Sequence, residues 1–236
     1  MVQSFLPPKD WFFSFNWLAW SISDLFFFYL MFPFIVKLFE NIKNNLLIIC
    51  FILVAFGIFG LMQIVPEKYQ LFVFYINPFF RIFDFGLGIL MFKILRYIKW
   101  GDFRPSFTFV EIFAIAVLVL FYEQSQYFPE VVRFSIYYWP PMFLFIAVFA
   151  MQKGHISKLL SMRWFLFLGD LSFGFYLYHQ LVLRYANRIN NKFDLISEQW
   201  IVNSVSFAII LVVCYFSYHL FEMPFKTKLR HWLLTK

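Results

Sequence analysis

Seven long apolar runs, separated by short polar connections, dominate the chain. They cover Trp17–Leu38, Leu46–Val65, Tyr75–Leu95, Phe107–Tyr122, Tyr137–Met151, Phe165–Leu183 and Trp200–Phe221. Several approach the roughly 20 residues that an α-helix needs to cross a bilayer, whereas the fourth and fifth runs are shorter. The pattern therefore predicts an all-α fold, a polytopic transmembrane helical bundle of about seven spans in a single integral-membrane domain over residues 1–236.

The composition agrees with lipid as the solvent of these helices. Hydrophobic residues make up 62% of the chain, and the mean hydropathy is +0.73. A soluble domain is roughly half apolar, so the excess has no place on a water-facing surface. Cys50 and Cys214 lie inside apolar runs without a CxxC spacing. This predicts two small buried side chains rather than a disulfide or a metal site.

The basic residues indicate a membrane orientation, not a nucleic-acid partner. The formal net charge is +7, but a nucleic-acid face needs clustered Lys and Arg, and here they fall in short groups between apolar runs. Alternate connections and the C-terminal tail carry thirteen of them, at Lys37, Lys43, Lys93, Arg96, Lys99, Arg104, Lys153, Lys158, Arg163, Lys226, Lys228, Arg230 and Lys236. The opposite connections carry six, at Lys9, Lys68, Arg133, Arg184, Arg188 and Lys192. By the positive-inside rule the richer side, with the C-terminus, is cytoplasmic.

The N-terminal segment Met1–Asp10 is predicted outside, yet it lacks the features of a signal peptide. Its composition is typical of a loop that enters a membrane protein already in place. We therefore expect further spans upstream of this sequence, or a separate chain that supplies them.

Polar groups at membrane depth are the first candidates for a site, because lipid cannot satisfy them. Asp24, in the outer half of the first run, either faces the bundle or lies at the interface beside Trp20.

The third run carries Arg81 and Asp84, three residues apart on one stripe with Asn77 and Gly88. This pair either binds substrate or forms an internal ion pair on a helix face that packs against neighbouring helices. Gly86 and Gly88 would let another helix approach closely.

The sixth run carries Ser172, Tyr176 and His179 at i, i+4 and i+7, so the three share one helix face. Such a face should look into a protein interior or a wet cavity. The reference pKa of a histidine lies near neutrality, which suits a general base, a proton shuttle or a hydrogen-bonding group, although a lone His near a helix end is often only an interfacial residue. Because that face offers no second metal ligand, no metal site is expected.

Glu222 ends the last run on a stripe with Tyr215 and Tyr218, shortly before Pro224. It either has a function or pairs with Lys226 at the cytoplasmic interface. The chain contains no nucleophile elbow, zinc-protease helix, P-loop or dinucleotide fingerprint. These residues alone fit an enzyme, a transporter or a scaffold.

Four motifs, in order, resemble the membrane acyltransferase-3 family. They are AWSISDLFFFYLMFP (Ala19–Pro33), NPFFRIFDFGLGILM (Asn77–Met91), FLGDLSFGFYLYHQLVL (Phe167–Leu183) and SYHLFEMPFK (Ser217–Lys226). They are similar to the family's WSLS-x-E, R-x-x-E/D-F-x-x-G, LG-x-x-SY-x-x-YL-x-H and SY-x-x-x-E-x-P elements.

The resemblance implies transfer of an acyl group, expected to be acetyl, from cytoplasmic acyl-CoA to a hydroxyl of a cell-surface glycan such as lipopolysaccharide. It implies a bacterial inner-membrane protein in contact with lipid, with acetyl-CoA or another acyl-CoA as donor substrate and no tightly bound cofactor. It implies two catalytic residues, His179 and Glu222. It implies substrate-binding residues at Arg81, Asp84, Ser172 and Tyr176. We expect Asp24 to bind substrate as well, although it lies one place before the family's Glu.

Two departures from the family pattern keep other functions open. The family's Glu falls at Leu25 rather than Asp24, and a one-residue shift turns a helical side chain by about 100°. The family's first spans, with a His thought to act as base and an R-x-x-R motif, have no counterpart here. The alternatives are therefore a truncated or degenerate non-catalytic member of the family, or a transporter.

Overall fold

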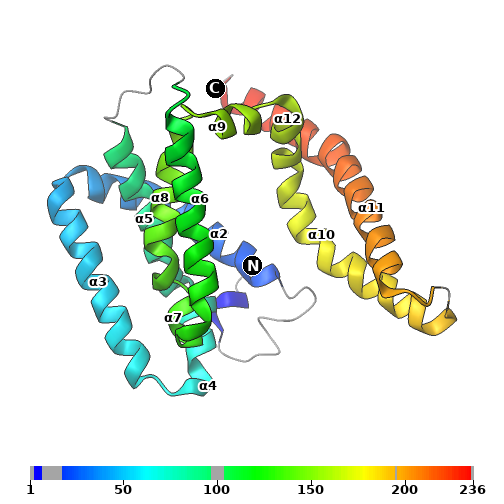
Figure 1. Cartoon of the computed structure of the whole chain (residues 1–236), viewed down its shortest axis with the longest axis horizontal. Coiled ribbons are helices and arrows are strands. Elements are labelled where there is room, and N and C mark those ends of the chain that lie inside the picture. Colours follow the sequence, from blue (N-terminus) through cyan, green and yellow to red (C-terminus); the bar gives the residue numbers. More distant parts are fainter. Residues whose placement is uncertain (1–2, 7–17, 97–103, 195, 235–236) are drawn as a thin grey trace. The chain divides into compact units, whose positions relative to one another are not determined.

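The computed structural model describes residues 3–6, 18–96, 104–194 and 196–234, and within them every regular element is helical (Figure 1). The predicted all-α fold is confirmed. The chain forms two compact units, one of Met1–Ser14 and Ala19–Leu159 and the other of Phe15–Leu18 and Leu160–Lys236. Their assembly into one domain stays a prediction.

Short and long helices alternate in the first unit. Its elements are η1 (Gln3–Phe5), α2 (Ala19–Glu40), α3 (Asn44–Ile64), α4 (Glu67–Gln70), the π-helical η2 (Leu71–Ile76), α5 (Pro78–Leu95), α6 (Phe107–Gln124), η3 (Ser125–Tyr127), α7 (Glu130–Arg133), η4 (Ile136–Tyr138) and α8 (Trp139–Ala150), with α9 (His155–Leu160) at its end. The second unit contains α10 (Arg163–Phe193), α11 (Gln199–Ser217), the π-helical η5 (Tyr218–Glu222) and α12 (Met223–Leu234).

Each of the seven apolar runs coincides with helix. Four stretches among the described residues are long and apolar enough to cross a membrane: Ala19–Glu40, Asn44–Ile64, Phe107–Tyr127 and Gln199–Trp232. The apolar stretch Ile136–Ala150 is shorter, and α5 and α10 carry more polar side chains. Length and composition thus support four of the seven predicted spans.

Local sequence explains where α3 ends and α5 begins. Pro66 disfavours helix at the residue before it, and Val65 is extended. Asn77 caps α5, since its Oδ1 accepts a hydrogen bond from the Phe79 backbone N–H at 2.9 Å and Pro78 follows it directly. The Asn77 side chain therefore serves the helix end and does not belong to the predicted polar stripe of α5.

Lys93 joins α5 to the end of α2. Its side chain is buried, and its ammonium donates to the carbonyl oxygens of Phe39 and, at 2.5 Å, of Ile42. Cations stabilise helix C-termini because the last carbonyls lack partners within the helix and carry partial negative charge.

The two glycines of α5 differ in what surrounds them. A Cβ at Gly86 would lie 3.2 Å from Phe51 Cζ of α3 and 3.6 Å from Phe39 Cζ of α2, so the predicted close approach is confirmed there. A Cβ at Gly88 would meet no described atom within 4 Å. The close approach predicted at Gly88 is wrong, because this residue borders open cavities.

Small buried clusters hold each unit together, while large apolar side chains cover its outside. The first unit packs around Ile58, Met62, Phe74, Val131 and Val132, and the second around Leu171, Ile210 and Cys214. Cys214 is buried as predicted, but Cys50 is exposed on α3. The burial prediction for Cys50 is wrong because an outward apolar position of a membrane helix faces lipid, not protein.

Candidate active site

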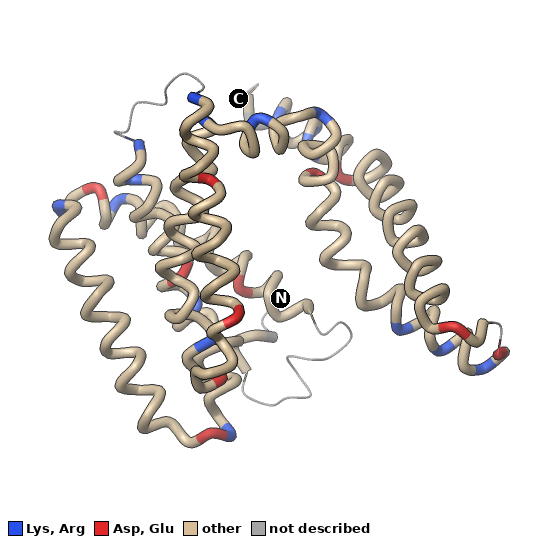
Figure 2. The backbone as a smooth tube through the Cα atoms, in the orientation of Figure 1, with Lys and Arg blue, Asp and Glu red and all other residues tan. Residues whose placement is uncertain are grey.

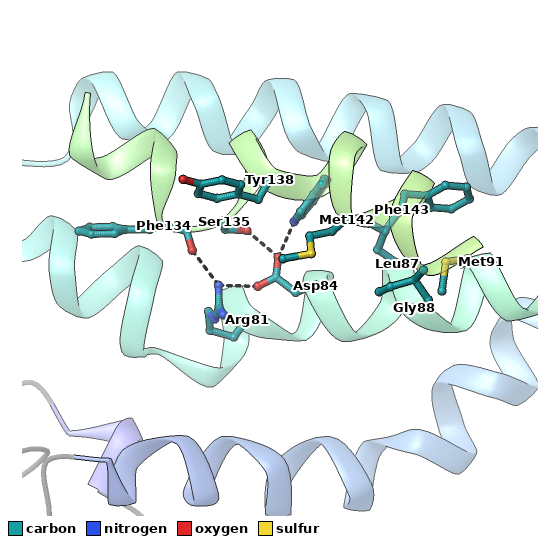
Figure 3. Close-up of a pocket in the computed structure, with 12 residues that line it drawn as sticks. Arg81, Asp84, Leu87, Gly88, Met91, Phe134, Ser135, Tyr138, Met142 and Phe143 are labelled. Carbon is teal, nitrogen blue, oxygen red and sulfur yellow. Dashed lines mark hydrogen bonds and ion pairs between the residues drawn. The ribbon is translucent and has the colours of Figure 1, made fainter. Parts of the chain in front are cut away.

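Arg81 and Asp84 form an ion pair in the first unit, as their spacing on α5 predicts. Arg81 Nη1 lies 2.6 Å from Asp84 Oδ2 and donates to the Phe134 carbonyl oxygen at 3.0 Å (Figure 3). The other carboxylate oxygen of Asp84 accepts from Ser135 Oγ at 2.6 Å and from Trp139 Nε1 at 2.5 Å. One carboxylate thus ties α5 to η4 and α8 and fixes the orientation of the guanidinium.

This network lines one end of a cavity of about 330 Å³. Figure 3 shows the ion pair at that end and apolar side chains toward the other. The apolar lining includes Leu87, Met91, Met142, Phe143 and Ile146. Ligand sites are typically apolar clefts with a few well-placed polar groups. The arrangement fits a carbonyl compound whose oxygen faces Arg81 and whose hydrocarbon part lies along the apolar wall.

Asp24 lies on the buried side of α2, with 3% of its surface exposed. Of the two positions open for it in the sequence, the structure selects the one facing protein. Its carboxylate lies near Ser4, whose hydroxyl donates to Ser23 Oγ at 2.9 Å, and within electrostatic reach of Arg81. Leu25, where the family's acid falls, is only half-buried. The first unit thus brings Asp24, Arg81 and Asp84 together, with the cation attracted by both carboxylates.

The residues Ser172, Tyr176 and His179 lie on α10 away from its contact with α11. That contact is made by a different face, which includes the buried Leu171 and Gly174. Ser172 and Tyr176 are exposed. What their face meets stays a prediction.

His179 is already held in one orientation. Its Nδ1 lies 3.1 Å from the Phe175 carbonyl oxygen, and its ring stacks on that of Phe175 at 5.9 Å between centroids. A carbonyl only accepts, so Nδ1 is the donor, which leaves Nε2 of the neutral ring as a proton acceptor. This is the tautomer that a general base requires.

Glu222 ends the π-helical turn η5 and lies against α10. Its Oε1 is 3.8 Å from where a Cβ of Gly174 would stand. In the same turn, the Tyr218 hydroxyl donates to Asp170 Oδ2 at 3.2 Å. Among the described residues no ion pair joins Glu222 to Lys226, and the role of Glu222 stays a prediction. The third and fourth sequence motifs therefore meet directly, and π-helical turns are frequent at functional sites.

Sequence reasoning overlooked several polar contacts. Tyr178 and Ser217 form a hydrogen bond of 3.1 Å between α10 and α11, and Asp170 and Tyr218 form the one described above. Glu111, on α6, is fully buried and accepts hydrogen bonds from the start of α9. A signal was available for Glu111, since a lone carboxylate in an apolar run needs partners.

The predicted site residues divide between the two units. Asp24, Arg81 and Asp84 lie in the first, and Ser172, Tyr176, His179 and Glu222 lie in the second. No cluster of three or more His, Cys, Asp or Glu suited to a metal ion occurs in the described part of the chain.

Comparison with known proteins agrees with the motifs. Residues 1–219 match the family defined by the acyltransferase-3 domain. The chain is 27% identical over 219 residues to "Acyltransferase MdmB" of Streptomyces mycarofaciens, covering 85% of this chain and 54% of that protein. It thus spans about half the length of this relative, and no solved structure matches it. Because the match covers nearly the whole sequence, the chain belongs to the acyltransferase-3 family.

Proposed function

We propose that this chain is part of a membrane acyltransferase that moves an acyl group, expected to be acetyl, from acyl-CoA to a hydroxyl of a cell-surface glycan. Family membership and the apolar helices support this proposal. The single observation that carries it is Arg81, a cation held in fixed orientation by Asp84 and the Phe134 carbonyl at the wall of an apolar cavity.

Arg81 has the donors that acyl transfer requires. When a hydroxyl attacks a thioester carbonyl, negative charge develops on the carbonyl oxygen, and a fixed donor stabilises it. Within the described part of the chain the hydrogen bonds of Arg81 use Nη1 alone. The guanidinium has five N–H donors, and we assign those on Nε and Nη2 to the substrate.

Proton transfer is the second requirement. In the proposed reaction His179 Nε2 takes the proton of the acceptor hydroxyl as its oxygen bonds to the acyl carbon. The carbon–sulfur bond then breaks, and the proton passes to the departing thiolate. Glu222 is the second catalytic group, while Asp24, Asp84, Ser172 and Tyr176 bind or orient the substrates.

The remaining parts of the proposal concern location and partners. The proposed location is a bacterial cytoplasmic membrane, and the distribution of Lys and Arg supports a C-terminus in the cytoplasm. The donor then approaches from the basic side and the glycan from the opposite one. A separate chain carrying further spans is the proposed partner.

The test uses membranes from cells with and without this gene, incubated with acetyl-CoA labelled in the acetyl group. We expect alkali-labile label in the glycan fraction only when the gene is present. Arg81→Gln should lower the rate about 10²–10³-fold, the usual cost of one oxyanion donor. Lys68→Gln is the control, since Lys68 lies outside the cavity. Equal labelling by Arg81→Gln and Lys68→Gln would contradict the role of Arg81, and no gene-dependent label would favour a non-catalytic protein.

A further inference from the structure

Gly88, the glycine of the second motif, has a position that acyl transfer does not explain. It lines the cavity beside Arg81 and also a second cavity of about 540 Å³ between α2 and α5. The walls of this second cavity are mainly aromatic and aliphatic, formed by Phe32, Val36, Phe39, Phe85, Ile89 and Phe92. Gly88 and Phe92 are exposed, so the cavity is a groove on the outside of the first unit. A Cβ at Gly88 would meet no described atom within 4 Å, so a side chain there would occupy the open space that Gly88 lines.

The groove has a basic end. Lys93 and Arg96 line it there, against one carboxylate from Glu40. Lys37 and Lys43 flank Glu40 in the chain. Lys93 is hydrogen-bonded to the end of α2, so the basic ends of the two helices meet. Figure 2 shows Lys and Arg at these ends of α2 and α5. The net charge of this end is positive.

The length of the groove matches one leaflet of a bilayer. Its lining along α5 and the capping residue Arg96 starts at Asp84, a rise of twelve residue steps or about 18 Å at 1.5 Å per residue. The hydrocarbon core of a bilayer is about 30 Å thick, so one leaflet contributes about 15 Å. A molecule with its charged group at Arg96 would therefore reach the bilayer midplane near Asp84 and Gly88.

We propose that the groove between α2 and α5 is a binding site for an anionic phospholipid. One acyl chain lies against the aromatic wall, and the phosphate lies at Arg96 in the positive field of Lys93. Basic pockets between membrane helices on the cytoplasmic side are suited to anionic headgroups. Hydrocarbon fills such a groove at the lowest cost, because its walls offer few polar partners. This site does not depend on the proposed acyl transfer.

The experiment is lipid binding to the purified, delipidated protein in detergent, followed by native mass spectrometry. The probes are phosphatidylglycerol and phosphatidylcholine with identical acyl chains, so only the headgroup charge differs. We expect phosphatidylglycerol to bind about fivefold more tightly, the effect of one basic residue near a membrane surface. Arg96→Gln should remove this preference, whereas Lys68→Gln should retain it.

Filling the groove tests its location. Gly88→Leu should weaken binding of both lipids, and Gly60→Leu is the matched control, because a Cβ at Gly60 also meets no atom within 4 Å and Gly60 lies outside the groove. If Gly88→Leu fails to fold, Val36→Trp fills the groove from α2. Equal affinity for the two lipids, or identical binding by the groove-filling and control variants, would overturn the proposal. So would displacement of phosphatidylglycerol by equimolar decanoyl-CoA, which would identify a soluble thioester as the occupant.

Discussion

Replacing Glu111 by Gln tests whether a buried carboxylate holds the connection between α8 and α10 in place. Glu111 has no exposed surface. Its carboxylate accepts from the backbone N–H groups of Gly154 at 3.1 Å, Ile156 at 3.0 Å and Ser157 at 3.2 Å, and from the Ser157 hydroxyl. These donors belong to the start of α9, whose first N–H groups lack partners within the helix.

The expected cost follows from how the four bonds divide between the two oxygens. Oε1 accepts three of them and Oε2 accepts one, from Ile156. In Glu111→Gln an NH₂ group, which cannot accept a hydrogen bond, replaces one of the two oxygens. The least destabilising placement of this group is the Oε2 position, where only the Ile156 N–H loses its acceptor. One buried unsatisfied group costs about 1–3 kcal/mol. At about 2–4 °C per kcal/mol for a chain of this size, a loss of ~2 kcal/mol lowers Tm by about 4–8 °C.

The assay is thermal unfolding of the purified protein in detergent, with hydrogen exchange followed over residues 152–160. Glu123→Gln is the matched control, because Glu123 lies on the same helix and is exposed. Exposed substitutions usually change stability by no more than about 0.5 kcal/mol. If Glu111→Gln and Glu123→Gln had the same Tm and the same exchange rates, the carboxylate would not hold the start of α9.

Four further predictions concern Gly154, Asp84, Tyr218 and His179. Gly154→Ala should destabilise the protein at least as much as Glu111→Gln, because the added Cβ would lie 2.0 Å from the Glu111 carboxylate. In thermal unfolding, Gly57→Ala should instead raise the stability of the protein by about 0.5–1 kcal/mol, because a Cβ at Gly57 meets no described atom within 4 Å. Asp84→Asn keeps an acceptor for Ser135 and Trp139 but removes the anion that orients the Arg81 guanidinium. Transfer in the labelled-acetyl assay should therefore fall while Tm changes by only a few degrees. An unchanged rate would argue against the orientation of Arg81 by Asp84. Tyr218→Phe loses one hydrogen bond, so Tm should drop by the equivalent of about 1 kcal/mol, and an unchanged Tm would mean that the bond contributes nothing. His179→Gln should lower transfer about 10²–10⁴-fold if the ring is a general base, and full transfer by a normally folded variant would remove it from the site.

Spacing along one helix was enough to predict the Arg81–Asp84 pair. Residues three apart on a helix are neighbours, so the ion pair follows from the sequence alone. The other two partners of Asp84, Ser135 and Trp139, stand 51 and 55 residues away in the chain. Contacts between helices depend on which helices pack together, and no local pattern carries that information.

The same limit applies to the other polar residues. Each of the seven apolar runs coincides with helix among the described residues, whereas α12 lies beyond the last run and was not predicted. The periodicity of α10 placed Ser172 and His179 on one face. It could not show that a different face of α10, with Gly174, packs against α11. Gly88 shows that a glycine in the sequence does not reveal its surroundings. A missing side chain is compatible with a closely packed helix and equally with an open cavity beside it.

The contact between Lys93 and the end of α2 has a consequence for biogenesis. The carbonyl oxygens of Phe39 and Ile42 are synthesised more than 50 residues before the ammonium that binds them. During insertion of α2 and α3 these carbonyls depend on water at the membrane surface. The end of α2 acquires its Lys93 partner only when α5 enters the membrane. The third apolar run, which forms α5, therefore helps to determine the residue at which the helix of the first run ends. A polypeptide arrested between α3 and α5 should therefore show a frayed end of α2.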